Sequence, residues 1–308
     1  MSIPSFYDSG LVGRYYEPRV LDAITAGQAA NGRPAKEDRE RVLLLLVDPQ
    51  VDFIHEDGSL SVPGAVADTR RTIEWIFKNV DSITGIIASL DTHTPLQIFY
   101  APWWINAHGE HPAPFTPITS DEVEKGVWKP TVEPEWSRDY VEQLEEKAKK
   151  TLMIWPYHTM VGTSGHAITP ALYEAITYHA AARDQQPVFI SKGSIPKTEH
   201  YSIFEPEVKV ADVPLGDLNL PLINLIDSYD VIYIAGQAKS HCVLETITSL
   251  VRYFGEHRPE FIKRWRLLED ATSSVAHPEI DFDAIANEQL ARFEKLGMEL
   301  RTTIDPVS

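Results

Sequence analysis

The only cysteine of the chain, Cys242, is the side chain best suited to nucleophilic chemistry. It follows a predicted strand and begins a predicted helix, where unpaired N–H groups and the helix dipole favour a thiolate. The preceding segment, AGQAKSHC, offers backbone N–H groups that could bind an oxyanion close to the sulfur. The alternative is that Cys242 is a small buried hydrophobic residue at the start of this helix.

Two charged residues could assist such a nucleophile. Lys192 follows an apolar run in the segment SKGS, and a lysine there can stabilise a thiolate and a carboxylate together. Asp48 lies in VDPQVDF, and a carboxylate beside a thiol can take its proton and return it to a leaving amine. Taken alone, Lys192 is equally well explained as a surface residue, and Asp48 as a helix or turn cap.

A second cluster has residue types that bind metals. Asp91 and His93 are separated by one residue after an apolar run, so both side chains can face one cation. The third ligand must come from elsewhere, and His158 in the loop WPYHTMVGTSG is the best candidate. For His108 and His111 we expect surface positions, and for His166 a role at a helix end. Carboxylate and imidazole ligands suit zinc, with iron or manganese as alternatives.

Apolar runs and helical periodicity predict an α/β fold. The runs at 42–47, 83–90, 188–191, 230–235, 266–268 and 298–303 read as six strands. Helices are predicted at 68–79, 167–183, 242–254 and 285–296. Strands and helices alternate, which predicts a three-layer α/β/α sandwich around a mainly parallel, Rossmann-like sheet. Ligands bind at the carboxyl ends of such strands. The candidates that follow predicted strands are Asp48, Asp91, His93, Lys192 and Cys242, together with Asp270.

Two segments extend this unit. Residues 1–40 form an N-terminal extension with few periodic signals, and the domain itself is predicted over 41–308. Residues 97–150 form a long insertion rich in tryptophan and proline. A loop of this length is functional or has its own small structure. We expect it to carry Trp103 or Trp104 towards the pocket, or to make an oligomer contact.

Length, composition and charge argue against several classes of protein and of binding partner. The chain has 308 residues, 43% of them hydrophobic, and a formal net charge of −17. Such an acidic surface argues against nucleic acids and anionic lipids as partners. A single cysteine excludes an intramolecular disulfide and CxxC metal sites. No run of 18 apolar residues and no signal peptide is present, so we expect a cytoplasmic protein without a membrane segment.

Six motifs in one order resemble the isochorismatase-like cysteine hydrolases, and among them the nicotinamidases. They are VDPQVDF, GSLSVPGA at 58–65, SLDTH, WPYH, SKGSIPKTEHYSIF and AGQAKSHCVLETI, and the resemblance covers 41–96 and 151–304. It implies that Cys242 is the nucleophile, Asp48 the general base and acid, and Lys192 the third member of a triad. It also implies oxyanion binding by the N–H groups of Ala238 and Cys242, and a cis peptide at Gln237–Ala238.

The same resemblance implies that Asp91, His93 and His158 bind a divalent metal, most often zinc, and that a glutamate such as Glu199 can contact this metal through water. The chain departs from the nicotinamidase pattern in three places. Gln97 stands where a second histidine is usual, Thr159 where a cysteine is usual, and the insertion is longer than typical.

These observations predict an enzyme that hydrolyses nicotinamide, or a similar small heteroaromatic amide, to the acid and ammonia through a thioester. The alternatives are a related cysteine amidase for another amide or carbamoyl compound, and a non-catalytic binding protein on the same fold. The metal ligands argue against the first alternative, and the intact triad against the second. We expect a small-molecule substrate and a homo-oligomer.

Overall fold

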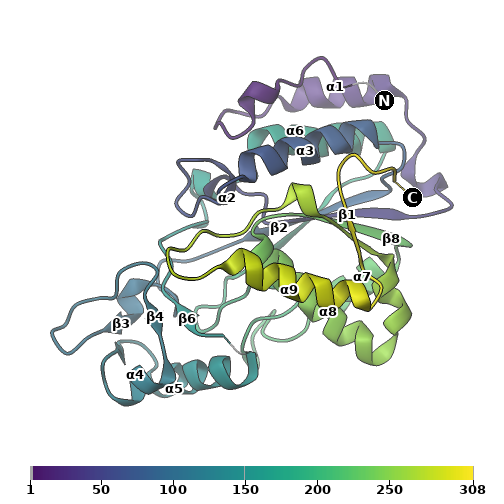
Figure 1. The fold of residues 1–308 in the computed structure, drawn as a ribbon. Helices are drawn as coiled ribbons and strands as arrows, with labels where there is room; N and C mark the ends of the chain where they lie inside the picture. Colours follow the sequence, from purple (N-terminus) through teal and green to yellow (C-terminus); the bar gives the residue numbers. More distant parts are fainter. Residues whose placement is uncertain (1–2, 149, 308) are drawn as a thin grey trace.

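A six-stranded sheet forms the centre of the protein (Figure 1). The computed structural model describes residues 3–148 and 150–307. The strands are β1 (Val42–Val47), β2 (Gly85–Asp91), β7 (Val188–Lys192), β8 (Val231–Gly236), β9 (Trp265–Leu268) and β10 (Glu299–Arg301). Their order is β10-β9-β8-β1-β2-β7, and every pairing between them is parallel. The predicted α/β fold with six mainly parallel strands is confirmed.

The inner strand β1 shows why this sheet needs cover on both faces. Its side chains point alternately to the two faces of the sheet and are all buried. Leu43, Leu45 and Val47 belong to one apolar cluster. Val42, Leu44 and Leu46 belong to another on the opposite face. A strand that is apolar throughout, such as VLLLLV, is therefore stable only between two layers of helices.

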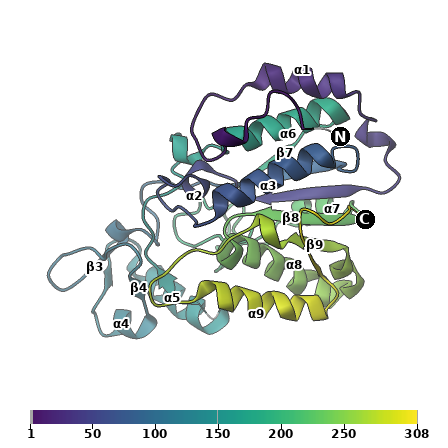
Figure 2. The same ribbon diagram turned by 45° about the horizontal axis from the view of Figure 1, so that its top comes forward.

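The two helical layers lie on opposite sides of the sheet (Figure 2). One layer contains α1 (Val20–Ala30), α3 (Ala65–Lys78) and α6 (Pro170–Arg183), and the other contains α7 (Leu220–Asp227), α8 (Leu244–His257) and α9 (Phe282–Lys295). A short helix, α2 (Val51–Ile54), follows β1. The four predicted helices are present, with ends shifted by up to three residues. Helices α1 and α7 were not predicted.

The N-terminal extension packs against the domain through α1. Arg19 forms an ion pair of 2.9 Å with the buried carboxylate of Glu174 on α6. A Cβ atom on Gly27 would lie 2.5 Å from the backbone oxygen of Tyr178, so only glycine allows the two helices to approach this closely. The division of the chain at residue 40 stays a prediction.

The insertion, at the lower left of Figure 1, packs in an apolar core that it shares with residues of the main domain such as Phe53 and Leu60. It contains α4 (Ser120–Glu124), α5 (Pro134–Gln143) and the antiparallel pair β3 (Trp104–Ile105) and β5 (Lys129–Pro130). Its strand β4 (Pro117–Ile118) pairs with β6 (Leu152–Met153), which follows the insertion. Trp103 and Trp104 are fully buried in this core, where their N–H groups donate to Ser137 Oγ and the backbone oxygen of Ile98. The prediction that they face the pocket is wrong, because the insertion needs them for its own packing.

In the part of the chain that the structure describes, we find no helix with the length and apolarity needed to cross a lipid bilayer.

Candidate active site

The predicted triad residues meet at the carboxyl edge of the sheet. Asp48 directly follows β1, Lys192 is the last residue of β7, and Cys242 comes after β8. Strands β8, β1, β2 and β7 are neighbours in the sheet, so their ends deliver these side chains to one place. All three side chains are buried.

Lys192 is the centre of this group. Its Nζ lies 2.9 Å from Asp48 Oδ2, 3.0 Å from Asp91 Oδ1 and 3.6 Å from Cys242 Sγ. It also donates to the backbone oxygen of His200 at 3.0 Å. The other oxygen of Asp48 accepts a 2.6 Å hydrogen bond from the hydroxyl of Ser89. One cation therefore contacts the candidate base, the candidate nucleophile and a candidate metal ligand.

Burial changes the protonation that the sequence suggested for Cys242. Loss of solvent raises the pKa of the thiol well above its usual value, and the positive charge of Lys192 only partly offsets this, because Asp48 raises it further. Burial also raises the pKa of Asp48, against the opposing effect of Lys192. Both shifts favour a protonated Cys242 thiol at rest and an Asp48 carboxylate that can accept its proton.

The loop before Cys242 has the backbone geometry expected from the resemblance. Gly236 has φ +120° and leaves no room for a side chain, since a Cβ atom would lie 2.1 Å from the backbone oxygen of Val47. The next peptide, Gln237–Ala238, is cis. The Gln237 amide holds this loop by donating to Asp68 Oδ2 and accepting from the N–H of Ser273. Cys242 then lies in a π-helical turn, Lys239–Val243, that continues into α8.

The predicted metal ligands also lie together. One ligand atom each from Asp91, His93 and His158 falls within 4.8 Å of the others, and all three side chains are buried. The Nε2 atoms of His93 and His158 lie 2.9 and 3.8 Å from Asp91 Oδ2. Asp91 thus contacts Lys192 with one oxygen and both histidines with the other.

The donor chemistry of this trio fits a divalent metal. Nδ1 of His93 is hydrogen-bonded to the backbone oxygen of Gly193 at 3.0 Å, and Nδ1 of His158 to that of Pro156 at 2.8 Å. A carbonyl can only accept, so each Nδ1 carries the proton when the ring is neutral, and each Nε2 has a lone pair facing Asp91. Burial lowers the pKa of His158 to about 4, which keeps that ring neutral. Two fixed imidazoles and one carboxylate are ligands that zinc accepts.

Two residues that position these ligands were missed in the sequence. The side chain of Gln50 donates to the backbone oxygen of Asp91 at 2.8 Å and accepts from its N–H at 2.7 Å. The carboxylate of Asp52 accepts the N–H of Thr159 at 2.7 Å, next to His158. Both lie in VDPQVDF, so the motif that suggested Asp48 also contained the signal for them.

The remaining histidines named above are not ligands of this group. His166 is hydrogen-bonded to Thr92 Oγ1 at 2.9 Å, and His111 to the backbone oxygen of Trp104 at 2.7 Å. His108 is exposed in the insertion. Asp270 holds the C-terminal segment by accepting hydrogen bonds from Thr303, away from the triad.

Replacing His158 by alanine should weaken zinc binding at least tenfold, because one of the three candidate protein ligands would be lost (about 1.4 kcal/mol for each factor of ten). Competitive titration with a zinc chelator measures the affinity. The matched control is His108→Ala, which removes an exposed histidine and should bind zinc like the wild type. Equal zinc affinity in both variants would remove His158 from the proposed site.

Several solved structures are similar in fold to this chain. The yeast nicotinamidase bound to the inhibitor nicotinaldehyde is 16% identical, with 85% of this chain and 99% of that chain covered and a TM-score of 0.57. A nicotinamidase/pyrazinamidase of Acinetobacter baumanii is 17% identical, with 87% and 98% covered and a TM-score of 0.56. The L. infantum protein in complex with nicotinate is 19% identical, with 88% and 96% covered and a TM-score of 0.51.

The chain has the isochorismatase-like fold of the nicotinamidases. No protein-family model matches the sequence, and no curated protein does. At identities below 20% the three structures share the fold of this chain, while its chemistry has to be argued from its own residues.

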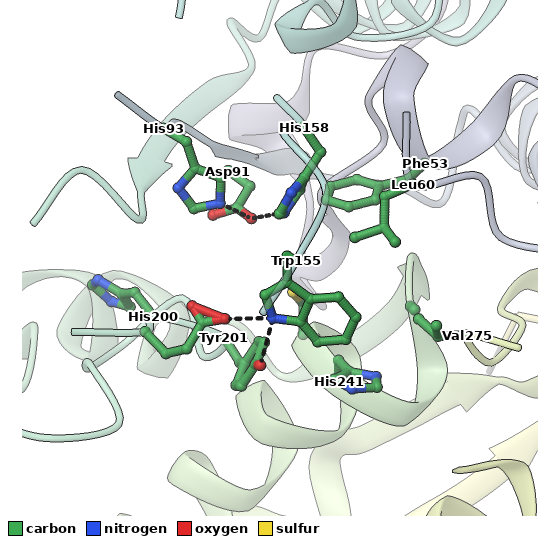
Figure 3. A pocket seen from close by; sticks show the side chains of 13 residues that line it. Phe53, Leu60, Asp91, His93, Trp155, His158, His200, Tyr201, His241 and Val275 are labelled. Atoms are coloured by element: carbon green, nitrogen blue, oxygen red, sulfur yellow. Dashed lines mark hydrogen bonds and ion pairs between the residues drawn. The ribbon is translucent and has the colours of Figure 1, made fainter. Parts of the chain in front are cut away.

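On this nicotinamidase fold, a narrow pocket contains Cys242 and the three candidate metal ligands. Figure 3 shows the side chains that line it. Cys242 and Ala238 line it together with Asp91, His93 and His158. Its apolar and aromatic walls come from Phe53, Leu60, Trp155, Tyr201 and Val275, with His200, His241 and Glu199 between them. The free volume is only about 30 Å³, room for two or three water molecules.

Glu199 is the acidic residue of this pocket that the resemblance singled out. It is buried, and its carboxylate accepts a 2.7 Å hydrogen bond from Trp155 Nε1. Burial raises the pKa of Glu199 to about 7, although His93 lowers it. Its carboxyl group therefore changes protonation near neutral pH. Trp155, Tyr201 and His241, which surround it, were not predicted as pocket residues.

Proposed function

We propose that this protein is a metal-dependent cysteine amidohydrolase that converts nicotinamide, or a similar heteroaromatic amide, to the acid and ammonia. The observation that carries this proposal is the position of Lys192 Nζ, which contacts Asp48, Cys242 and the metal-ligand candidate Asp91 at once. A binding protein has no need for a buried lysine, thiol and two carboxylates in this arrangement, because burying them is unfavourable.

The reaction begins with activation of the thiol. Asp48 takes the proton of Cys242, which its raised pKa favours, and the ammonium group of Lys192 stabilises the thiolate that forms. The thiolate attacks the amide carbonyl and a C–S bond forms. The negative charge moves to the carbonyl oxygen, which the backbone N–H groups of Ala238 and Cys242 bind.

The C–N bond then breaks. Asp48 donates the proton it took to the leaving nitrogen, and ammonia departs. The acyl group remains on Cys242 as a thioester. Asp48, ionised again, takes a proton from water, and the hydroxide attacks the thioester carbonyl. Release of the acid breaks the C–S bond, and the proton returns from Asp48 to the sulfur.

Asp91, His93 and His158 would hold the metal, which we propose to be zinc. When bound, it supplies a Lewis-acidic centre that attracts the ring nitrogen of a pyridine or pyrazine amide. The residues of this chain orient the rest of the substrate through the apolar walls of the pocket. The choice of amide is supported by two structures of the same fold, one bound to nicotinaldehyde and one to nicotinate.

Ammonia release from a panel of amides tests the proposal. Zinc-loaded enzyme should hydrolyse nicotinamide and pyrazinamide, and benzamide more slowly, because benzamide has no ring nitrogen. Removal of zinc should reduce the first two rates towards the benzamide rate. A carbamoyl amino acid serves as the substrate of the competing amidase hypothesis. If no compound releases ammonia from the zinc-loaded enzyme, the proposed function is wrong.

A further inference from the structure

A second, larger cavity lies directly behind one wall of the pocket. Its volume is about 400 Å³, compared with about 30 Å³ for the pocket itself. Its walls come from the end of the insertion, from the π-helical turn and α8, and from the start of α9. A substituted aromatic amide needs more room than the pocket has, and the free space next to the pocket is in this second cavity.

The wall between the two spaces is one side chain thick. Trp155, Glu199, Tyr201 and His241 line both the pocket and the second cavity. The ring centroids of Trp155 and His241 are 5.4 Å apart, and those of Tyr201 and His241 are also 5.4 Å apart (Figure 3). A shift of one of these rings would join the two spaces.

His241 brings an unused hydrogen-bond donor to this wall. Ser240 Oγ accepts the N–H of Val275 at 3.1 Å and lies 2.8 Å from His241 Nδ1. The Ser240 hydroxyl donates to Nδ1 in the tautomer that carries the proton on Nε2. Burial lowers the pKa of His241 to about 3, so its ring is neutral, and in this tautomer Nε2 is a donor. Nε2 has no hydrogen-bond partner among residues 3–148 and 150–307.

The rest of the second cavity is mainly apolar. Leu144, Leu152, Met153, Leu244, Phe282 and Ile285 contribute to its lining. Among the residues of that lining that the structure describes, Lys150 is the one lysine or arginine, and it already contacts Glu207 at 2.5 Å and Glu245 at 2.8 Å. The carboxyl groups of Glu199 and Glu245 outnumber this one ammonium group among the described lining residues, which disfavours an anionic ligand. The surroundings suit a neutral apolar group.

We propose that the second cavity binds a neutral apolar substituent of the substrate, so that this enzyme acts on aromatic amides larger than nicotinamide. The amide head lies at Cys242, the substituent passes the shared wall, and His241 Nε2 donates to an acceptor atom, such as an ether oxygen, that links the two. This inference rests on the proposed amidohydrolase function and names its class of substrate.

A substrate series tests the inference. Ammonia release is compared for nicotinamide, for nicotinamide with a ring-linked benzyl ether, and for the same ether ending in a carboxylate. We expect kcat/KM of the neutral ether to exceed that of nicotinamide at least tenfold. We expect the carboxylate to lose most of this gain, because Glu199 and Glu245 face it.

A variant that fills the second cavity provides the structural test. Ile285 lines the cavity from α9 and is 52% exposed, so Ile285→Trp adds a ring there without disturbing the core. The matched control is Ile304→Trp, at a position that is 89% exposed near the C-terminus. We expect Ile285→Trp to reduce kcat/KM for the neutral ether at least tenfold and for nicotinamide less than twofold. Ile304→Trp should change neither.

The outcomes separate the two proposals. If nicotinamide is hydrolysed but the neutral ether is not preferred, the inference fails and the proposed function stands. The inference also fails, and the proposed function stands, if Ile285→Trp lowers kcat/KM equally for nicotinamide and for the neutral ether. If the neutral ether and its carboxylate react equally fast, the cavity does not select neutral groups and the inference is wrong. If neither nicotinamide nor any ether releases ammonia, both proposals fail.

Discussion

Replacing Cys242 by alanine should reduce ammonia release from nicotinamide by at least about 10⁴-fold, to the background of the assay. The thiol is the proposed nucleophile, and it is the only sulfhydryl group in the chain, so no other cysteine can replace it. Single-turnover and steady-state assays with zinc-loaded protein measure the loss. The substitution removes one buried sulfur atom and should have only a small effect on the free energy of unfolding.

Two controls make this result specific. Zinc affinity should be unchanged in Cys242→Ala, because the proposed ligands are Asp91, His93 and His158. A nicotinate-type acid should still bind, because the apolar walls of the pocket remain. If the alanine variant keeps more than a tenth of the wild-type rate while binding zinc normally, Cys242 is not the nucleophile and the thioester mechanism is excluded.

The second large effect concerns Lys192. Lys192→Met should reduce the free energy of unfolding by about 3–5 kcal/mol, because two buried carboxylates lose their shared cation. Both Asp48 and Asp91 lie within 3.0 Å of Lys192 Nζ, and all three side chains are less than a tenth exposed. The same variant should lose amide hydrolysis by at least about 10³-fold, since the thiolate is no longer stabilised. Urea unfolding and ammonia release measure the two effects.

A matched substitution separates this effect from the loss of any lysine. Lys197 forms an ion pair of 2.6 Å with Glu133 at the surface, where both side chains are more than a third exposed. Lys197→Met should therefore change the free energy of unfolding by no more than about 1 kcal/mol. Adding Asp48→Asn to Lys192→Met should restore part of the lost stability, because one unpaired charge disappears. A double variant that is less stable than Lys192→Met would show that Lys192 does not act through these carboxylates.

The central strands could be predicted because they are short apolar runs that must be buried away from water. The runs at 42–47 and 230–235 match β1 and β8 within one residue. Helix α1 was missed because its buried face is narrow: within α1 only Ala23 and Gly27 are buried, so it has little apolar periodicity. In the insertion, the tryptophans indicated aromatic packing correctly but not its location, since a local core and a substrate pocket need the same residue types.

The sequence by itself determined the fold class and the candidates at the strand ends, because apolar periodicity and the order of the motifs are local properties. It also identified the residues of the triad and of the metal group. The roles of these residues remain proposals. Only the tertiary structure showed that Lys192 joins the two groups through Asp91, and that burial raises the pKa of the Cys242 thiol. Both depend on distances between residues far apart in the chain and on burial. The larger cavity behind Trp155 and His241 has the same origin, because its walls come from three separate segments that meet only after folding.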